Sequence, residues 1–552
     1  MPLSKVDIRP RRSMLFFAVL AIVMVFSSYL FVIVLAAACV YLPYLIVDSG
    51  SANFQVLALF LGGIVMAGAM LWSLVPRHDK FVAPGMPLSR QDQPRLFAEL
   101  DDIAASLNER LPSEVYLIPE ANAFVADRGG VMGFGSRRVM GLGLPLFSAL
   151  SVSQFRAVLA HEFAHYYGGD TSLGPWVYRT KMAIVRIFKN VGSLRQLTRV
   201  ALIRVMYMVV SSVLQAYFKL FLRAINLVSR RQEYRADELA CLVAGREPLI
   251  GGLRAIHGAA LAWPFYWQSE VAPMVGGGAL PAIGDGFARF LAVPQINDAV
   301  SNSLQKTLQE ATTAPYDTHP PLRDRIAATE NLLALPSQQN ARPASTLLDH
   351  LPDLELHFVE DRISDLKPGT LTYVSWDDVA LKVTIPSWQK AVAAQASFLK
   401  DVTAESIPAQ IPKFADIGSH IPDPKGMLLT PDQRTQRAGQ IFATALVLAL
   451  IENGWTLTVQ PGLFRLRRGA DDLNPFQVVA DLMANKRTPA EWVGQCKSLG
   501  ISHLPLDPAE RTALAHPAAL SVQPTLFDSP SSRQPCQNCE TIKSGKSDRS
   551  PQ

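Results

Sequence analysis

The 552-residue chain has little charge for its length. Asp, Glu, Lys and Arg make up 18% of its residues, hydrophobic residues make up 49%, and the mean hydropathy is +0.16. Because soluble globular proteins contain about 25% charged residues, this composition disfavours a wholly soluble protein and excludes a disordered one. The five cysteines are too few and too scattered for a disulfide framework. At about 100–200 residues per domain, the length predicts two to four structural units.

Two long runs lack charge altogether and predict a membrane anchor. Residues 14–47 and 54–75 contain no Asp, Glu, Lys or Arg, and a bilayer core needs about 20 helical residues. We therefore predict transmembrane helices at about 14–40 and 54–75, within an anchor of residues 1–80. A cleaved signal peptide is the alternative for the first run, but its apolar stretch exceeds the usual ~7–15 residues and a second run follows.

Lysine and arginine flank this predicted hairpin at its two outer ends, and the connecting loop has none. The flanking cations are Lys5, Arg9, Arg11, Arg12, Arg77 and Lys80. Under the positive-inside rule, both ends of the hairpin lie in the cytosol. We therefore predict an integral, multi-pass protein of the cell or inner membrane whose chain after residue 80 is cytosolic.

A histidine pair in a predicted helix carries the first sign of chemistry. The helix starts at Ser151, which forms a capping box with Gln154, and it contains His161-Glu162-Phe163-Ala164-His165. Histidines four residues apart share one helical face and can bind one metal ion, and Glu162 can reach a water on that metal. A pair of satisfied core histidines is the alternative, but the motif and its apolar flanks favour the metal site.

A catalytic zinc needs a third protein ligand and an open position for water. Glu233 is the best candidate, because it shares a helical face with Asp237 four residues later. One carboxylate can bind the metal while the other accepts a hydrogen bond from a ligand imidazole. Such a pair alone is typical of a solvated charged face, but beside the histidine pair it predicts the third ligand.

Three motifs together resemble one family. They are His161-Glu162-x-x-His165, Glu233-Tyr-x-Ala-Asp237, and Thr318-His319-Pro320-Pro321 with Arg325-Ile326. This set is similar to that of HtpX-type and CAAX-prenyl-protease-type membrane zinc endopeptidases, and the resemblance covers roughly residues 81–335. It implies a mostly helical gluzincin domain with a small sheet, preceded by a transmembrane hairpin.

The resemblance implies a role for each residue of the metal motifs. His161, His165 and Glu233 would hold one Zn²⁺ per chain, and Asp237 would orient a ligand histidine. Glu162 would be the general base, which takes a proton from the zinc-activated water and returns it to the leaving amine.

Two further assignments follow from the resemblance alone. His319 would lie near the cleft and stabilise the oxyanion, although a packing role in an ordinary turn is an equal alternative. Asn122, Ala123 and Phe124 match the family's edge strand beside the substrate cleft, where an extended protein or peptide substrate could pair by β-augmentation.

The segment between the metal motifs departs from the family. Relatives often carry two more spans there, but Arg204 and Lys219 bracket only 14 uncharged residues, so we predict no clean span. Residues 171–232 lack Asp and Glu and carry eleven cations: Arg179, Lys181, Arg186, Lys189, Arg195, Arg199, Arg204, Lys219, Arg223, Arg230 and Arg231. We predict an interfacial helix on anionic lipid. A solvated basic face is the alternative, and nucleic-acid binding is disfavoured because no recognition motif accompanies the charge.

The rest of the chain resembles nothing that we can assign. We predict a C-terminal α+β region at 336–515, with a hairpin at 455–466 and an apolar helix at 441–451 that is too short for a span. Residues 516–552 are rich in Ser, Pro and Gln, and we predict a disordered tail. The single Cys536-x-x-Cys539 in that tail is attributed to chance.

These features together predict an α+β membrane-anchored zinc endopeptidase. As the resemblance implies, its substrates would be membrane-associated or misfolded proteins, in quality control or processing. One alternative is a zinc-binding pseudoprotease or scaffold at the membrane, against which the intact Glu162 argues. The other is a CAAX-type processing protease, which would need an enclosed chamber of several more spans.

Overall fold

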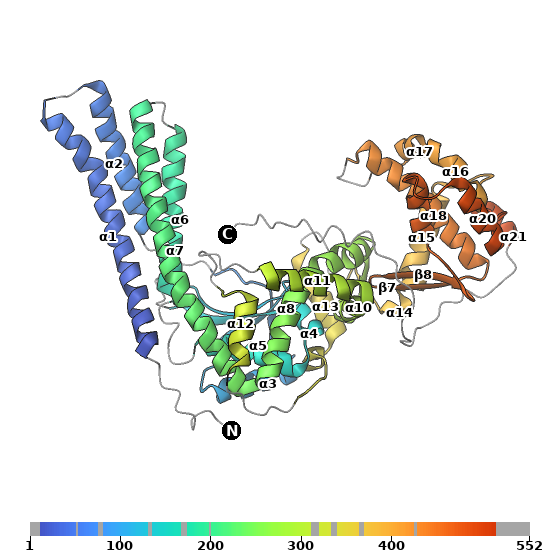
Figure 1. Cartoon of the computed structure of the whole chain (residues 1–552), viewed down its shortest axis with the longest axis horizontal. Coiled ribbons are helices and arrows are strands. Elements are labelled where there is room, and N and C mark those ends of the chain that lie inside the picture. Colours follow the sequence, from blue (N-terminus) through green and yellow to red (C-terminus); the bar gives the residue numbers. More distant parts are fainter. Residues whose placement is uncertain are drawn as a thin grey trace. The chain divides into compact units, whose positions relative to one another are not determined.

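The computed structural model is mostly helical, with small sheets (Figure 1). It describes residues 12–50, 53–75, 81–130, 135–166, 174–197, 200–310, 319–332, 339–363, 369–423 and 428–514. The predicted tail with Cys536 and Cys539 lies outside these residues, as does Thr318.

The chain divides into two compact units that interleave in sequence. The first contains residues 1–261 and 300–351, and the second contains 262–299 and 352–552. This division differs from the predicted boundary after residue 335, because a segment from the middle of the predicted peptidase domain packs with the C-terminal region. Two long helices carry the chain between the units: α8 (Arg246–Tyr266) and α11 (Pro294–Glu310).

Four helices of the first unit lie side by side as a bundle (Figure 1). They are α1 (Arg12–Asp48), α2 (Phe54–Leu74), α6 (Gly174–Leu197) and α7 (Ala201–Ala244). The carbonyl of Cys39 in α1 approaches Gly63 in α2 so closely that no Cβ would fit there. Small residues of this kind let two helices of a membrane bundle pack tightly.

Three of the described helices are long and apolar enough to cross a membrane: Phe16–Asp48, Phe54–Leu74 and Ala201–Ala244. The first two confirm the predicted hairpin, although α1 continues through Pro43 to Asp48 rather than ending near residue 40. Bilayer helices tolerate an internal proline.

The third candidate lies in the segment between the metal motifs, where the sequence predicted no clean span. The prediction counted uncharged residues along the chain and did not consider the faces of the helix. Tyr207 and Leu214 of α7 are buried in the bundle, whereas Arg204 and Lys219 lie on its exposed face.

A four-stranded sheet adjoins the helices that carry the metal motifs. Its strands are β1 (Met86–Leu88), β2 (Glu114–Ile118), β3 (Ala123–Arg128) and β4 (Arg137–Gly143), in the order β1-β2-β4-β3. β2 and β4 are parallel and the other pairs are antiparallel. β3 therefore forms an edge of the sheet and pairs only with β4 among the described strands.

Short helices complete the first unit around this sheet. They are α3 (Pro94–Ser106), α4 (Leu144–Ala149), α5 (Val152–Ala164), α12 (Leu322–Glu330) and the 3₁₀ turn η4 (Ala344–Leu347). The predicted capping box of α5 is confirmed, because Ser151 and Gln154 exchange both hydrogen bonds. It fixes the start of the helix that carries both histidines.

The second unit is also largely helical, with a three-stranded sheet. Its elements are η3 (Trp267–Val271), α9 (Ala272–Gly276), β5 (Ala279–Pro281), α10 (Ile283–Ala292), α13 (Leu351–Arg362), β6 (Thr372–Val374), α14 (Trp376–Val379), η5 (Ala380–Thr384), α15 (Ile385–Ala393), η6 (Ala396–Phe398), η7 (Ala404–Ser406), α16 (Ile407–Gln410), η8 (Ile411–Lys413), α17 (Phe414–His420), α18 (Pro431–Glu452), β7 (Thr456–Gln460), β8 (Leu463–Arg468), β9 (Asp471–Leu473), α19 (Pro475–Met483), α20 (Pro489–Leu499) and α21 (Pro508–Leu514).

Two local predictions for this unit are confirmed. β7 and β8 form the expected hairpin, with Gly462 at a φ of 71° in its turn. The apolar run 441–451 lies within α18 and is buried in the core of the unit, as expected of a core helix rather than a span.

Candidate metal centre

The two histidines lie on the last turn of α5, a helix buried along most of its length. His161 is 6% exposed, and His165 forms the C-cap of the helix with a partly buried side chain. Their rings lie edge to face with centroids 4.8 Å apart. The spacing of four residues therefore brings both imidazoles to one point beside the neighbouring helix.

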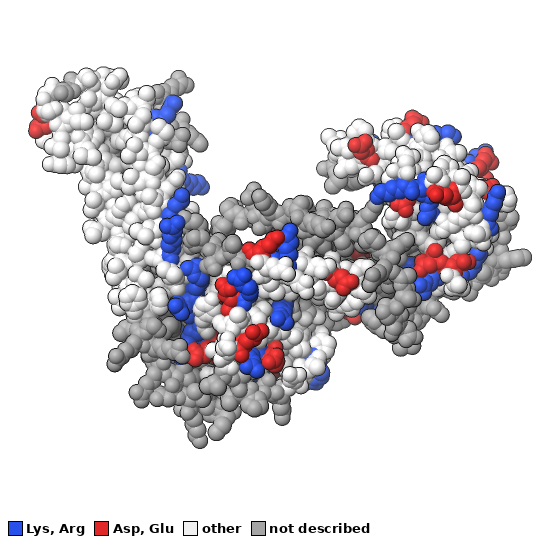
Figure 2. All heavy atoms as spheres, in the orientation of Figure 1, with Lys and Arg blue, Asp and Glu red and all other residues white. Residues whose placement is uncertain are grey.

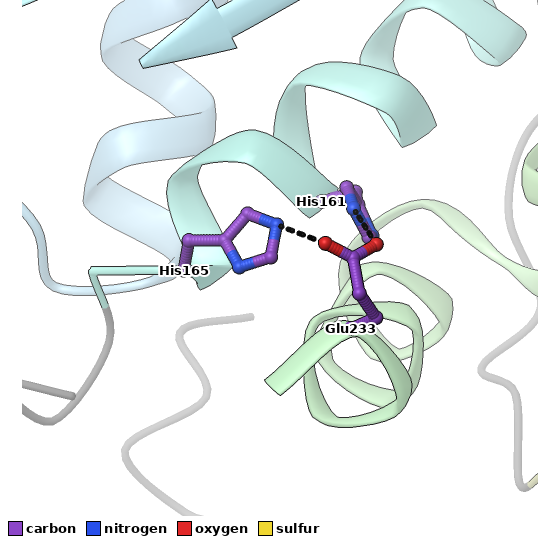
Figure 3. A group of neighbouring side chains, drawn as sticks. All are labelled: His161, His165 and Glu233. Atoms are coloured by element: carbon purple, nitrogen blue, oxygen red, sulfur yellow. Dashed lines mark ion pairs between the residues drawn. The ribbon is translucent and has the colours of Figure 1, made fainter. Parts of the chain in front are cut away.

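That neighbouring helix is α7, which brings Glu233 to the histidine pair (Figure 3). Its Oε2 lies 3.5 Å from Nε2 of His161, and its Oε1 lies 3.5 Å from Nε2 of His165. One ligand atom from each of the three residues lies within 4.8 Å of the others.

The three side chains fit a zinc ion. Two imidazole nitrogens and one carboxylate are a donor set that catalytic zinc accepts, with a fourth position left for water. Among the described residues, the buried Oε2 of Glu233 has no hydrogen bond of ordinary geometry, and its nearest ion-pair partners, His161 and Arg325, each lie 3.5 Å away. Burial of such an oxygen is costly unless a cation or donor meets it.

Asp237, one turn beyond Glu233 on α7, contacts His161 from the other side. Its Oδ1 lies 2.9 Å from Nδ1 of His161. A carboxylate at Nδ1 holds the proton on that nitrogen and leaves Nε2, which faces Glu233, free to bind a metal. This position agrees with the orienting role that the resemblance implies.

Arg325 of α12 completes a buried network that the sequence analysis gave no role. Its guanidinium donates to both carboxylate oxygens of Asp237, at 2.9 and 2.6 Å. It also lies 3.5 Å from Oε2 of Glu233. The motif Arg325-Ile326 was the only sequence signal for it, because 88 residues separate Arg325 from Asp237.

Burial sets the protonation of two groups at the site. Burial raises the pKa of Glu162 to about 7, which brings the carboxylate close to the basicity that a general base needs at neutral pH. Burial, together with the charge of His161, lowers the pKa of His165 to about 4. The ring of His165 is therefore neutral at pH 7 and can offer a lone pair to a metal.

His161 behaves differently because two carboxylates face it. Burial and the charge of Arg325 lower its pKa, but the bonds to Asp237 and Glu233 outweigh them and raise the pKa to about 9. The position between these carboxylates thus stabilises positive charge, which also favours a divalent cation there.

His319 lies against the same glutamate. Its Nδ1 is 2.9 Å from Oε1 of Glu233, its side chain is 68% exposed, and the hydrogen bond to Glu233 raises its pKa. The structure therefore places His319 at the mouth of the site, where its oxyanion role stays a prediction.

The predicted substrate segment lies at the open edge of the sheet. Asn122 immediately precedes β3 and its side chain accepts a hydrogen bond from the backbone of Ala123, while Phe124 pairs with Gly141 of β4. β3 also packs beside α5. The predicted strand is thus adjacent to the helix of the histidine pair.

The described helices include candidate membrane spans, and the H-E-x-x-H motif lies in a candidate metal centre. Comparison with known proteins shows which family this part of the chain resembles. Residues 90–333 match the model of peptidase family M48. The chain is 30% identical over 200 residues to "Protease HtpX" of Xylella fastidiosa strain M12, a match that covers 34% of this chain and 64% of the relative. It is 29% identical over 230 residues to "Protease HtpX" of strain 9a5c, covering 38% and 74%.

A relative from another organism has a similar name. The "Protease HtpX homolog" of Syntrophobacter fumaroxidans is 31% identical over 126 residues, which cover 22% of this chain and 41% of the relative. No solved structure matches. Residues 90–333 are thus similar to peptidase family M48 and to the HtpX proteases, in agreement with the resemblance seen in the motifs.

Proposed function

We propose that the chain is a zinc-dependent endopeptidase anchored in a membrane. The observation that carries this proposal is the convergence of His161, His165 and Glu233 from two helices beside a carboxylate, Glu162, whose pKa is raised to about 7. The M48 match and the printed names of the relatives support protease activity.

Each residue of the site would have a separate role in peptide hydrolysis. Zinc held by His161, His165 and Glu233 would activate a water and polarise the scissile carbonyl. Glu162 would accept the proton of the attacking water and donate it to the leaving amine. Asp237 would keep His161 in the tautomer that binds through Nε2.

Substrate would bind as an extended chain along β3. An edge strand offers backbone donors and acceptors, so a substrate strand gains affinity with loose sequence preference. Membrane-associated or misfolded proteins supply such extended segments, and we propose them as the substrate class. One chain would bind one zinc, and the catalytic unit would face the cytosol.

Two other functions are the alternatives to this proposal. A pseudoprotease would bind zinc and clients without turnover, but Glu162 stands intact beside the predicted ligands. A CAAX-type processing protease would need a chamber enclosed by several more spans than the three candidates among the described helices. Neither alternative has an observation that favours it.

Casein digestion in detergent tests the proposal. We expect the wild-type protein to cleave casein, a chelator to stop cleavage, and Glu162→Gln to abolish cleavage while retaining zinc. His161→Ala, His165→Ala and Glu233→Ala should each lose zinc. Glu238→Gln is the matched control, because Glu238 lies on α7 beside the site and pairs with Arg235 instead.

Each contrary result has a distinct meaning. Activity that survives in Glu162→Gln would remove Glu162 as the general base. Full zinc occupancy in Glu233→Ala would remove Glu233 as a ligand. Zinc binding without any cleavage by the wild type, for casein and for membrane-protein substrates, would favour the pseudoprotease.

A further inference from the structure

The charges of the helical bundle are almost all of one sign. In α1, α2, α6 and the part of α7 before Glu233, the sequence contains one acidic residue, Asp48. The described cations at the end of the bundle away from Asp48 form what we call the cationic face: Arg179, Lys181, Arg186, Lys189, Lys219, Arg223, Arg230 and Arg231.

The cationic face lies along one edge of the bundle. Figure 2 shows Lys and Arg gathered over α6 and α7, while the edge formed by α1 is white. α1 itself exposes large apolar side chains: Phe16, Val19, Ile22, Val23 and Phe26. The bundle is therefore amphipathic, with cations over α6 and α7 and apolar side chains on α1.

Contacts between the helices show at which level the cations lie. Arg186 of α6 donates to the carbonyl oxygen of Ser73, one residue before α2 ends at Leu74. Phe188 of α6 packs on Phe218 of α7, with ring centroids 5.7 Å apart. The end of the uncharged α2 thus lies at the level of Arg186 on α6 and, through the ring contact, near that of Phe218 on α7.

Contacts of α7 with α1 show which part of α1 lies at this level of the bundle. The hydroxyl of Tyr217 in α7 lies 2.8 Å from Oγ of Ser27 and 3.1 Å from Oγ of Ser28. From Ser28 to Asp48, α1 is 21 residues long, about the length that crosses a hydrocarbon core. Lys219 follows Tyr217 by two residues, so it lies where that core would end.

We propose that the cationic face binds the phosphate groups of anionic phospholipids in the cytosol-facing leaflet. Phosphates lie just outside the hydrocarbon core, at the level where α2 ends and the cations begin, and juxtamembrane cations attract an anionic leaflet. Lys189, Lys219 and Arg223 are exposed and would contact the headgroups first. The proposal rests on the membrane location proposed above and is independent of proteolysis.

A lipid-binding assay on the purified full chain tests this surface. The protein in neutral detergent is titrated with phosphatidylglycerol and with phosphatidylcholine, each with the same acyl chains and the same fluorophore. We expect phosphatidylglycerol to bind at least about tenfold more tightly, and salt to weaken its binding because exposed charges are screened over ~8 Å at physiological ionic strength.

A triple substitution should remove this preference. Each cation near an anionic surface contributes about fivefold, so Lys189→Gln, Lys219→Gln and Arg223→Gln together should weaken phosphatidylglycerol binding by up to about 100-fold. The control removes the same charge from exposed lysines of the second unit: Lys390→Gln, Lys400→Gln and Lys497→Gln. Lys189→Arg with Lys219→Arg should keep wild-type binding, which separates loss of charge from misfolding.

Several results would overturn the proposal. Equal affinity for the two lipids, or wild-type affinity in the triple variant, would leave the cationic face without a lipid role. Competition by glycerol phosphate at the same concentration as phosphatidylglycerol would show a small-anion site instead. An RNA oligonucleotide that binds more tightly than phosphatidylglycerol, and only when the three cations are present, would show a nucleic-acid surface.

Discussion

Asp237 contacts both the predicted metal ligand His161 and the buried Arg325. Its replacement by asparagine therefore tests whether Asp237 orients His161 for metal binding. Its Oδ1 lies 2.9 Å from Nδ1 of His161, and Arg325 donates to both of its oxygens. Asparagine keeps the shape of the side chain but removes its negative charge and turns one acceptor into a donor. We therefore expect Asp237→Asn to release His161 from its fixed tautomer and to leave Arg325 poorly paired.

The expected size of the effect follows from these contacts. Loss of the group that orients a metal-binding histidine weakens metal affinity about 10–100-fold, or roughly 1.4–2.8 kcal/mol. Asp237 is 1% exposed, so water cannot take its place and the upper half of this range applies. Breaking the buried pair with Arg325 should also cost up to roughly 3–5 kcal/mol of folding free energy, less whatever Glu233 recovers at 3.5 Å.

Zinc competition against a chromogenic chelator measures the first quantity, and thermal unfolding of the metal-free protein measures the second. Glu238→Gln is the control, since it makes the same change of charge on the next residue of α7, at a carboxylate bonded to Arg235 at 2.6 Å. If Asp237→Asn binds zinc as tightly as the wild type, or if the control weakens binding equally, Asp237 does not orient a ligand.

Three further predictions follow from burial and from the placement of charge. Protonated Glu162 cannot accept a proton, so the rate of cleavage of a soluble peptide should fall about tenfold per pH unit below the pKa of Glu162. That pKa is about 7 without metal, and a bound cation would lower it further. A rate that rises toward acid pH would contradict this. Burial raises the pKa of Glu355 in the second unit from 4.5 to about 7. Between these two pH values the folded state holds a proton that the unfolded state has lost, so the free energy of unfolding should fall by up to about 3 kcal/mol as the pH rises from 4.5 to 7. In denaturant titrations, Glu355→Gln should reduce this pH dependence, and the exposed Asp361→Asn should not. A topology reporter fused after residue 80 should report the cytosol and one inserted near Gly50 the opposite side, and equal signals would exclude the hairpin.

Local sequence signals predicted the elements that depend on neighbouring residues. The capping box at Ser151, the turn at Gly462 and the uncharged runs of α1 and α2 each rest on interactions within a few residues or on composition alone. The histidine pair is equally local, since four residues of helix place both rings on one face. These features could therefore be read from the chain before any fold was known.

Features that depend on distant residues could not be predicted in this way. Arg325 meets Asp237 across 88 residues, and no spacing rule relates an arginine on one helix to a carboxylate on another. Residues 262–299 pack with the C-terminal unit, although their sequence follows the metal motifs without a linker. The candidate span in α7 was not predicted because exposed cations such as Arg204 and Lys219 interrupt the uncharged run along the chain.

A single helix connects the bundle to the metal centre, and this continuity limits which substrates could reach the site. α7 runs without a break from Ala201 to Ala244, and Glu233 follows Lys219 by 14 residues, or about 21 Å at 1.5 Å per residue. If the hydrocarbon core ends at Lys219, as proposed, the zinc ligand stands that far along the helix from the membrane. An extended chain advances about 3.3 Å per residue, so a membrane protein would have to offer roughly six residues beyond its last span before a peptide bond could lie beside Glu162.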